Sequence, residues 1–389
     1  MRRFFSLDLL DNRYPQLHGV RVLAIISVVQ YHVTSIFALE QGVRLDRDWV
    51  MSSLAIFFGM DLFFILSGFL IGSILLYSLR NKDTQKHPIR RFYLRRVFRT
   101  FPSYYIVLTV LVFTTHLTIW QRHNLRWEYT YLTNFHSVAR WDSLMFWGWS
   151  LALEEQFYLF VPILFFVLRW LKTDGQRIGL LVLIWLSALV VRLVIYFRHD
   201  GPWLDFILYG TVYFKTYTRF DTLVMGILLA VLNDRYREPI ARWLREPFHR
   251  ALVALPSLLC LWMLVRPWTF APHELNLFHI FAWGTITTVM WLGFLLLLLY
   301  GEGPIHSFLG APVFRRLATL GYGIYLVHIP LCDRVVVPMA HALDRRQVSL
   351  IVIWPLSLVV LLALSAALAY AMHLVIEKPS LWVRDRVAR

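Results

Sequence analysis

The chain has 389 residues, of which 58% are hydrophobic and only 16% are charged, and its mean hydropathy is +0.56. This balance excludes an ordinary soluble domain and indicates a protein that crosses a lipid bilayer. The formal net charge of +15 resembles that of a nucleic-acid-binding protein. Basic loops on one side of a membrane explain most of that charge, so we expect no nucleic-acid binding. Cys260 and Cys332 both lie in apolar runs, and we expect neither a disulfide framework nor a metal site.

Apolar runs repeat along the whole chain, and about ten are long enough, or nearly so, to cross a bilayer as helices. The first run lacks the short apolar core and cleavage site of a signal peptide, so we expect it to be retained. No repeat, low-complexity tract or linker divides the chain, which predicts one all-α integral membrane domain over residues 1–389. The spans are predicted at 20–40, 51–78, 101–119, 147–168, 178–197, 218–232, 251–265, 277–300, 321–340 and 348–375.

Lysine and arginine are unevenly distributed between alternate connections. With the N-terminus placed inside, the cytoplasmic connections hold 25 of these residues and the external connections hold 10. Because basic residues are retained on the cytoplasmic side, both termini are predicted to lie in the cytoplasm.

The first span carries Arg21 near its start and His32 eleven positions later. Eleven residues are close to three helical turns, so both side chains lie on one face, roughly 16 Å apart along the axis. That face presents a cation at the rim and a titratable base near mid-depth. In the alternative interpretation, Arg21 reaches the lipid headgroups and His32 donates one hydrogen bond to a neighbouring helix.

Five arginines precede the third span in "RRFYLRRVFRTFPSYY", from Arg90 to Tyr105. Arg96 and Arg99 lie three residues apart, so they can hold one polyanion from the same helix face, with Arg95 beside them. Guanidinium groups bind phosphate in a bidentate manner. The alternative is a basic girdle with aromatic anchors that sets topology alone.

The fourth span begins with two adjacent carboxylates, Glu154 and Glu155, in "WSLALEEQFYLFVP". Adjacent helical residues diverge by about 100°, so only one of them can face a given interior site. A carboxylate inside a membrane is expected to have a partner in the bundle. Arg219, which lies beside Asp221 in "TRFDTLVMGILLA", is the candidate partner, and an ion pair that serves structure alone is the alternative.

Other features favour packing over chemistry. His328 in "GYGIYLVHIPL" lies near mid-depth of the ninth span, where a buried histidine with satisfied hydrogen bonds is the simpler interpretation. Ser67, Gly68 and Gly72 in "DLFFILSGFLIG" suit close helix packing better than a nucleophile. Aromatic residues of the external loop suit an interfacial belt better than a sugar-binding surface: Trp127, Tyr129, Tyr131 and Trp141.

Taken in order, these segments resemble the membrane-bound acyltransferase 3 family. A single motif would be a weak signal, but the ordered set covers nearly the whole chain and is specific. The set consists of the arginine and histidine of the first span, "DLFFILSGFLIG", "RRVFRTFPSYY", "WSLALEEQFYLFVP", "RFDTLVMG", "YGIYLVHIPL" and the closing "IEKP".

The resemblance implies a multi-pass enzyme of the bacterial cytoplasmic (inner) membrane. Such an enzyme moves an acyl group, usually acetyl, from cytoplasmic acyl-CoA to a hydroxyl of a carbohydrate, a glycolipid or a glycosylated small molecule. Some relatives carry an additional soluble esterase-like domain. Because this chain ends in "EKPSLWVRDRVAR", we expect no such fused domain.

Matched residue by residue, the resemblance assigns Arg21 and His32 to the first-span pair and Glu154 to the glutamate of the fourth span. Arg96 and Arg99 match the family's arginine pair. Arg219 and His328 match family positions whose roles are less well understood.

The chemistry agrees with this assignment. A hydroxyl that attacks a thioester needs a base, and a neutral imidazole such as His32 suits that role. Glu154 could fix the tautomer of His32, and Arg21 or Arg219 could stabilise negative charge as it develops. The phosphates of acyl-CoA require arginines at the aqueous rim, which Arg96 and Arg99 supply.

Two other classes of protein remain. A secondary transporter or an exporter of a glycolipid would also place His, Glu and Arg inside about ten helices, although its usual related halves are not visible here. A non-catalytic scaffold would not need an arginine pair beside a helix that carries a base. No motif marks the acceptor, the acyl chain length or the oligomeric state.

Overall fold

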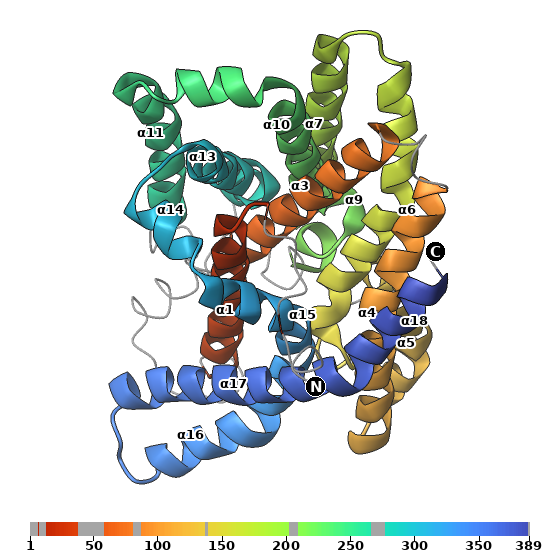
Figure 1. Ribbon diagram of the computed structural model, residues 1–389. Coiled ribbons are helices and arrows are strands. Elements are labelled where there is room, and N and C mark those ends of the chain that lie inside the picture. Colours follow the sequence, from red (N-terminus) through yellow and green to blue (C-terminus); the bar gives the residue numbers. More distant parts are fainter. Residues whose placement is uncertain are drawn as a thin grey trace.

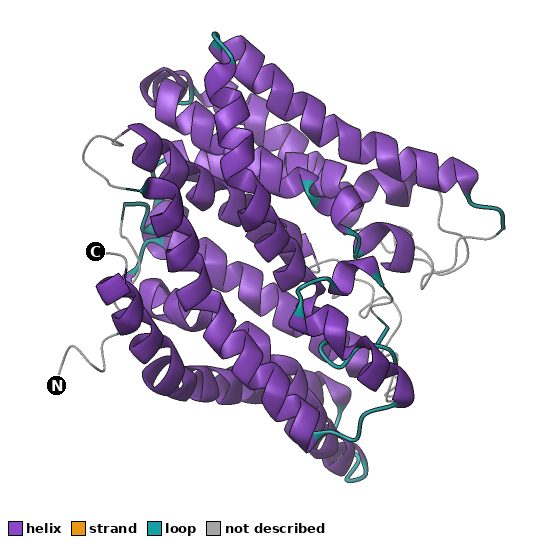
Figure 2. Cartoon of the chain, turned by 90° about the vertical axis from the view of Figure 1, so that its right-hand side faces the viewer, coloured by secondary structure: helices purple, strands orange, loops and turns teal. Residues whose placement is uncertain are grey.

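The protein is described here from a computed structural model, which describes residues 7, 13–37, 58–80, 87–136, 139–201, 209–265 and 277–387. Within these residues the chain is helical and contains no strand (Figures 1 and 2). The α-helices are α1 (Gln16–Ser35), α3 (Gly59–Arg80), α4 (Pro88–Thr114), α5 (Ile119–Tyr129), α6 (Trp149–Trp170), α7 (Asp174–Arg198), α9 (Thr216–Arg219), α10 (Asp221–Trp243), α11 (Pro247–Leu264), α12 (Leu277–Phe281), α13 (Thr287–Tyr300), α14 (Pro304–Leu309), α15 (Pro312–Leu331), α16 (Val337–Asp344), α17 (Leu350–Met372) and α18 (Lys378–Val387). The short 3₁₀ and π turns are η3 (Thr133–Phe135), η4 (Phe146–Gly148), η5 (Tyr209–Tyr213), η7 (Ala282–Ile286), η8 (Cys332–Val336) and η9 (His373–Glu377).

Eight helical segments in the described residues are long and apolar enough to cross a membrane. The all-α class is therefore confirmed for these residues, and the number of apolar helices is consistent with an integral membrane protein. The count differs from the ten predicted, because Gly284–Tyr300 is apolar but shorter and α10 contains charged residues in its second half. The cytoplasmic location of both termini stays a prediction.

Helix α1, which carries Arg21 and His32, occupies the middle of the bundle (Figure 1). It packs against α3, α14, α15 and α17, so its side chains face other helices on several sides. Gly19 allows the close approach of α14, because a Cβ at this position would lie 2.7 Å from the Cα of Leu309. A substitution in α1 therefore acts on the interior of the protein.

Helices α3 and α10 cross closely through small residues. A Cβ on Gly68 would collide with the carbonyl oxygen of Leu223, and one on Gly72 would lie 2.8 Å from the Cβ of Ala230. On α10, a Cβ on Gly226 would lie 2.8 Å from the Cα of Gly68. The packing role predicted for Gly68 and Gly72 is confirmed, since larger side chains would force the two backbones apart.

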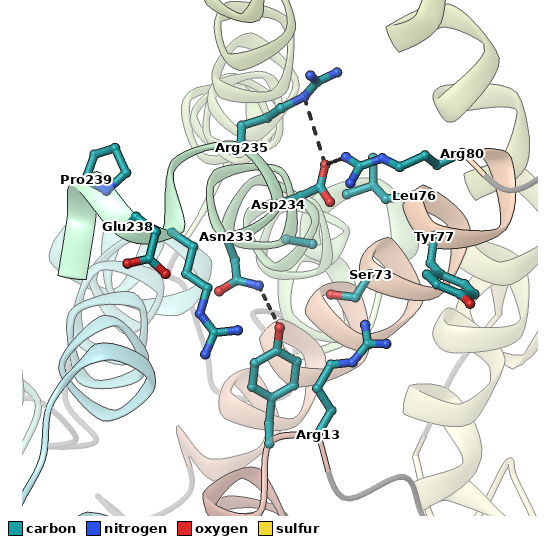
Figure 3. A pocket seen from close by; sticks show the side chains of 13 residues that line it. Arg13, Ser73, Leu76, Tyr77, Arg80, Asn233, Asp234, Arg235, Glu238 and Pro239 are labelled. Carbon is teal, nitrogen blue, oxygen red and sulfur yellow. Dashed lines mark hydrogen bonds and ion pairs between the residues drawn. The ribbon is translucent and has the colours of Figure 1, made fainter.

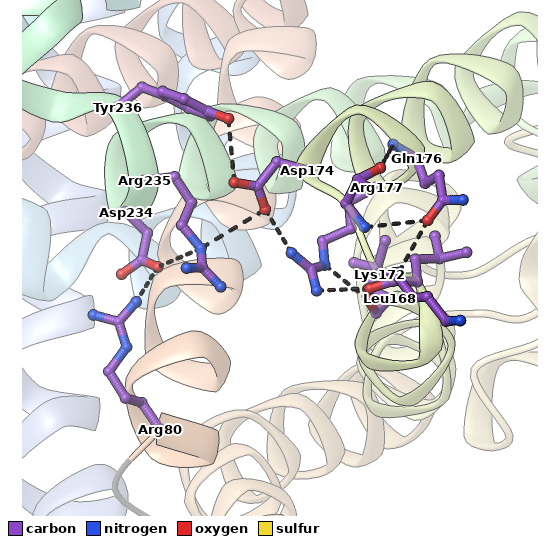
Figure 4. A network of polar contacts seen from close by, with 11 residues as sticks. Arg80, Leu168, Lys172, Asp174, Gln176, Arg177, Asp234, Arg235 and Tyr236 are labelled. Carbon is purple, nitrogen blue, oxygen red and sulfur yellow. Dashed lines mark hydrogen bonds and ion pairs between the residues drawn. The ribbon is translucent and has the colours of Figure 1, made fainter.

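On the side that the loop charges predict to be cytoplasmic, a polar network joins α3, α7 and α10 (Figure 4). Asp174 accepts a hydrogen bond from Arg177 at 2.5 Å and another from the hydroxyl of Tyr236 at 3.1 Å. Asp234 forms ion pairs with Arg80 and Arg235. The ends of these three helices are therefore held together by charge pairs outside the apolar core.

The segment between α4 and α6 folds around Glu128, a fully buried residue of α5. Its carboxylate accepts hydrogen bonds from the backbone N–H groups of Leu144, at 2.7 Å, and Met145, at 3.2 Å. Tyr131 stacks on Tyr104 with ring centroids 4.2 Å apart and is only 5% exposed. The prediction of an interfacial aromatic belt is thus wrong for Tyr131, because this ring packs inside the folded loop.

Burial raises the pKa of Glu128 from 4.5 to about 7. A raised pKa in the folded state means that folding favours the protonated carboxyl, so this contribution to stability is complete below the unfolded pKa and is lost as pH rises through about 7. We expect the melting temperature of the detergent-solubilised protein to fall over this range, and the fall to be smaller in Glu128→Gln. Equal pH dependence in the two proteins would contradict this role of Glu128.

Candidate active site

A cavity of about 500 Å³, called the central cavity here, lies among α1, α3, α4, α6 and α15. Its lining brings together residues that the sequence analysis singled out from three separate spans: Arg21, Arg95, Arg96, Arg99 and Glu154. Arg13 and Tyr77 line its end on the predicted cytoplasmic side. The central cavity therefore joins a cationic rim to a carboxylate within the bundle.

Arg96 of α4 is arranged so that one of its hydrogen-bond donors remains available to a ligand. The guanidinium of Arg96 lies over the rings of Tyr158, at 5.4 Å, and Phe92, at 5.8 Å. Its buried Nε atom has no hydrogen-bond partner in the described part of the chain. Such an unpartnered buried donor favours an anion as the occupant.

A smaller pocket of about 230 Å³, called the side pocket, shares Arg95, Arg96 and Arg99 with the central cavity. Its fourth arginine is Arg384 of α18, which the sequence analysis did not single out. The only signal for Arg384 was the basic character of the chain's last residues, which we attributed to topology. Tertiary structure is needed to bring α18 beside α4.

Glu154 points into the central cavity and is 7% exposed. One carboxylate oxygen accepts a short hydrogen bond from the hydroxyl of Ser67, and the other accepts one from Tyr158 at 3.3 Å. Ser67 thus positions a carboxylate, in addition to the packing role expected of its segment. Glu155 is absent from the residues that line this cavity, as the divergence of neighbouring helical residues requires.

His32 and His328 form a hydrogen-bonded pair. Nδ1 of His328 lies 2.7 Å from the backbone carbonyl oxygen of Tyr325, and because a carbonyl can only accept, this nitrogen carries the proton. Nε2 of His328 lies 2.9 Å from Nδ1 of His32. In a neutral His328, Nε2 is an acceptor, so Nδ1 of His32 donates and its Nε2 holds the lone pair.

The partnership expected between His32 and Glu154 is wrong in this geometry. No hydrogen bond joins the two residues in the part of the chain that the structure describes, and His328 holds the His32 ring instead. One turn before Glu154 on α6, the hydroxyl of Ser150 lies 2.5 Å from the hydroxyl of Tyr325. A narrow gap of about 20 Å³, called the passage, is lined by Glu154, Ser150 and Tyr325.

Arg219 is paired with a residue other than the one expected, and Asp221, for which no partner was predicted, is also part of an ion pair. Arg219 donates to Asp61 of α3 at 2.5 Å, and Arg192 of α7 donates to Asp221 at 2.7 Å, with all four side chains buried. The expected pairing of Arg219 with a glutamate of the fourth span is therefore wrong. Asp61 was overlooked although it is the only ionisable residue in "DLFFILSGFLIG". None of the four lines the central cavity, which indicates a structural role.

Comparisons with known proteins agree on one family. The sequence profile of the acyltransferase 3 family, described as an acyltransferase domain, matches residues 14–373. Peptidoglycan O-acetyltransferase OatA of Listeria monocytogenes is 27% identical over 349 residues, which cover 82% of this chain and 49% of OatA. YrhL of Bacillus subtilis, to which the same activity is provisionally assigned by name, is 31% identical over 240 residues, covering 57% of this chain and 34% of YrhL.

The matched part thus spans about half or less of the length of these relatives. No solved structure matches the chain.

The buried pair of Arg219 and Asp61 should be important for stability. We expect Arg219→Gln and Asp61→Asn each to lower the free energy of unfolding by about 3 kcal/mol, because each leaves a buried charge without its partner. The double variant should recover part of the loss. Thermal or denaturant unfolding in detergent measures this. Arg384→Gln, which breaks the partly exposed pair with Asp385, is the control and should cost less than about 1 kcal/mol. Single variants as stable as the control would contradict the assignment.

Proposed function

The chain belongs to the acyltransferase 3 family, and on that premise we propose that it is a membrane-bound O-acyltransferase. The donor is acyl-CoA, with acetyl as the group transferred, and the acceptor is a hydroxyl of a carbohydrate at or beyond the outer face of the bacterial cytoplasmic membrane. The names of its relatives support a peptidoglycan glycan as the acceptor. The observation that carries the proposal is the arginine-lined central cavity, which lies beside the helix that bears His32.

The dimensions of the first helix support the donor assignment. Arg21 lines the cavity, and His32 lies roughly 16 Å further along the same helix. The arm of CoA between its diphosphate and its sulfur has about twelve bonds, the length of about four extended residues, or roughly 14 Å. A diphosphate held by Arg21, Arg96 and Arg99 would therefore place the thioester near His32.

The passage supports the same route. It begins at Glu154, on the wall of the central cavity, and is bounded at its other end by Tyr325, whose carbonyl holds His328. The walls between these two ends are apolar, with Ala24, Ile25 and Val28 from α1. A thin arm with few charges suits such a gap, which is narrow enough to require side-chain movement before the arm can enter.

In the reaction, Nε2 of His32 removes the proton of the acceptor hydroxyl as its oxygen attacks the thioester carbonyl. The tetrahedral intermediate collapses with cleavage of the carbon–sulfur bond. The imidazolium of His32 returns the proton to the sulfur, and the products are the ester and free CoA. His328 would hold the His32 ring in the tautomer that leaves Nε2 unprotonated.

The proposal is tested with the purified chain in lipid nanodiscs, labelled acetyl-CoA and soluble disaccharide fragments of peptidoglycan. We expect labelled ester and an equal amount of free CoA, and a loss of about 10²-fold or more in turnover for His32→Ala, since it removes the base. CoA binding by His32→Ala should remain. Binding of CoA without transfer to the glycan would reject the acceptor class, and an active His32→Ala would reject the base.

The role of His328 is tested by two amides of different length. In His328→Gln the side-chain oxygen can occupy the position of Nε2 and accept the proton of His32, whereas the shorter side chain of His328→Asn leaves that position empty. We expect Gln to retain turnover about tenfold above that of Asn, with equal affinity for CoA. Steady-state rates and CoA binding separate the two effects. Equal turnover in both variants would show that His328 serves packing alone.

Glu154 should affect turnover more than Glu155. In a glutamine at 154 one end of the side chain is an NH2 donor, so the hydroxyl of Ser67 or that of Tyr158 must turn to accept, and both hydrogen bonds lose the strength that the carboxylate charge gives them at the entrance of the passage. We expect Glu154→Gln to lower kcat about tenfold or more with little change in CoA affinity, and Glu155→Gln to remain close to wild type. The opposite order would show that the wrong carboxylate has been chosen.

A further inference from the structure

A further pocket, of about 530 Å³ and called the rim pocket, lies between the ends of α3 and α10 on the predicted cytoplasmic side (Figure 3). It shares Arg13, Tyr14, Ser73 and Tyr77 with the central cavity, so the two spaces are neighbours. The side pocket shares none of these four residues. No residue of the rim pocket belongs to the proposed machinery of transfer.

The lining of the rim pocket is cationic. It contains four arginines, which are Arg13, Arg80, Arg235 and Arg237, against two carboxylates, Asp234 and Glu238. Figure 3 shows a terminal nitrogen of Arg80, from α3, and the Nε of Arg235, from α10, approaching Asp234. Arg80 is 58% exposed, and only one of its terminal nitrogens is joined to Asp234, so further donors remain for a ligand.

The rim pocket also offers aromatic surface. Tyr77 is 51% exposed, and the guanidinium of Arg13 lies 5.6 Å from the centroid of its ring. Tyr14 is held in place by Asn233, whose amide donates to its hydroxyl at 2.8 Å. An aromatic face beside several arginines suits a nucleobase attached to a phosphorylated sugar.

Helix α3 connects this pocket with the proposed site of transfer. Ser67 contacts Glu154 in the central cavity, Ser73 and Tyr77 line both spaces, and Arg80 lines the rim pocket alone. These positions are spread along about 20 Å of the helix, and Ser73, Tyr77 and Arg80 share one face of it. In CoA, the 3′-phosphorylated ribose and the adenine follow the diphosphate in the direction away from the thioester.

We propose that the rim pocket binds the 3′-phosphorylated adenosine end of the acyl-CoA donor, with Arg80 and Arg235 on the 3′-phosphate and Tyr77 against the adenine. This inference rests on the proposed function, because it takes acyl-CoA as the donor. It places the nucleotide at a site separate from the arginines of α4. The side pocket is the less suitable place, because it is less than half as large and shares its α4 arginines with the proposed diphosphate site.

The test compares CoA with 3′-dephospho-CoA, which differs only in the phosphate at issue. Equilibrium binding is measured on the full chain in phosphatidylcholine nanodiscs. Wild type should bind CoA about tenfold more tightly than 3′-dephospho-CoA, since a charge-assisted contact to phosphate is worth at least that factor. Arg80→Ala should abolish the preference by weakening CoA alone, and Arg80→Lys should keep part of it.

Two further variants make the result specific. Asp234→Asn removes the carboxylate that competes for Arg80 and should increase the preference for CoA. The matched control is Arg242→Ala, which should leave both affinities unchanged. Arg242 is an exposed residue of α10 that does not line the pocket. Loss of the preference in Arg384→Ala with retention in Arg80→Ala would move the phosphate to the side pocket and overturn the proposal.

The phosphate that these arginines recognise could also belong to a lipid headgroup. Repeating the measurement with phosphatidylglycerol in the nanodisc distinguishes the two sources. Two results together would show that the pocket holds lipid and that the proposal is wrong. The first is that anionic lipid weakens CoA binding in wild type but not in Arg80→Ala. The second is that wild type shows no preference for CoA over its dephosphorylated form. If wild type binds neither CoA nor 3′-dephospho-CoA, the donor assignment of the proposed function fails instead.

Discussion

The structure depends on one constraint, which is that a buried charge inside an apolar bundle is costly unless a group of opposite charge lies beside it. Asp61 of α3 is paired with Arg219, and Asp221 of α10 is paired with Arg192 of α7. These two ion pairs join α3 to α9, which directly precedes α10, and α7 to α10 through the interior. Small residues then allow α3 and α10 to approach until Gly68 faces Gly226. Together these contacts hold in place the helix face of α3 that carries Ser67.

The same constraint applies to the candidate site, whose polar groups follow one another along the axis of α1. At the level of Arg21, the arginines of α1 and α4 line the central cavity, which is large enough for part of a ligand. Further along, Glu154 is held by Ser67 and Tyr158, and beyond it the hydroxyl of Tyr325 lies between Ser150 and the carbonyl of Trp147. The histidine pair lies at the end of this series. Each level is supported by contacts between different helices, so the order of polar groups does not depend on one flexible side chain.

The histidine pair also shows how a backbone group can decide the chemistry of a side chain. The carbonyl of Tyr325 belongs to the turn before His328 and can only accept a hydrogen bond. Through two rings, this carbonyl sets which nitrogen of His32 is left with a lone pair. A carboxylate is a common partner of a buried imidazole, whereas a neutral imidazole can hold a second ring by a hydrogen bond without adding a buried charge.

The sequence by itself determined the helical class, the membrane environment, the family and the residues of interest on each span, because hydropathy and motif order are properties of neighbours along the chain. It also predicted that Gly68 and Gly72 serve helix packing, which needs only their small size. It did not determine which polar groups meet. Glu154 and Arg219 were each expected beside the wrong partner, since the choice among buried charges depends on the rotation and depth of helices far apart in sequence. Tertiary structure alone brings Asp61 to Arg219, His328 to His32 and Arg384 to the arginines of α4. The physical reason is that pairing inside the bundle depends on three-dimensional distance. One helical turn separates Ser150, which contacts Tyr325, from Glu154, which contacts Ser67 and Tyr158.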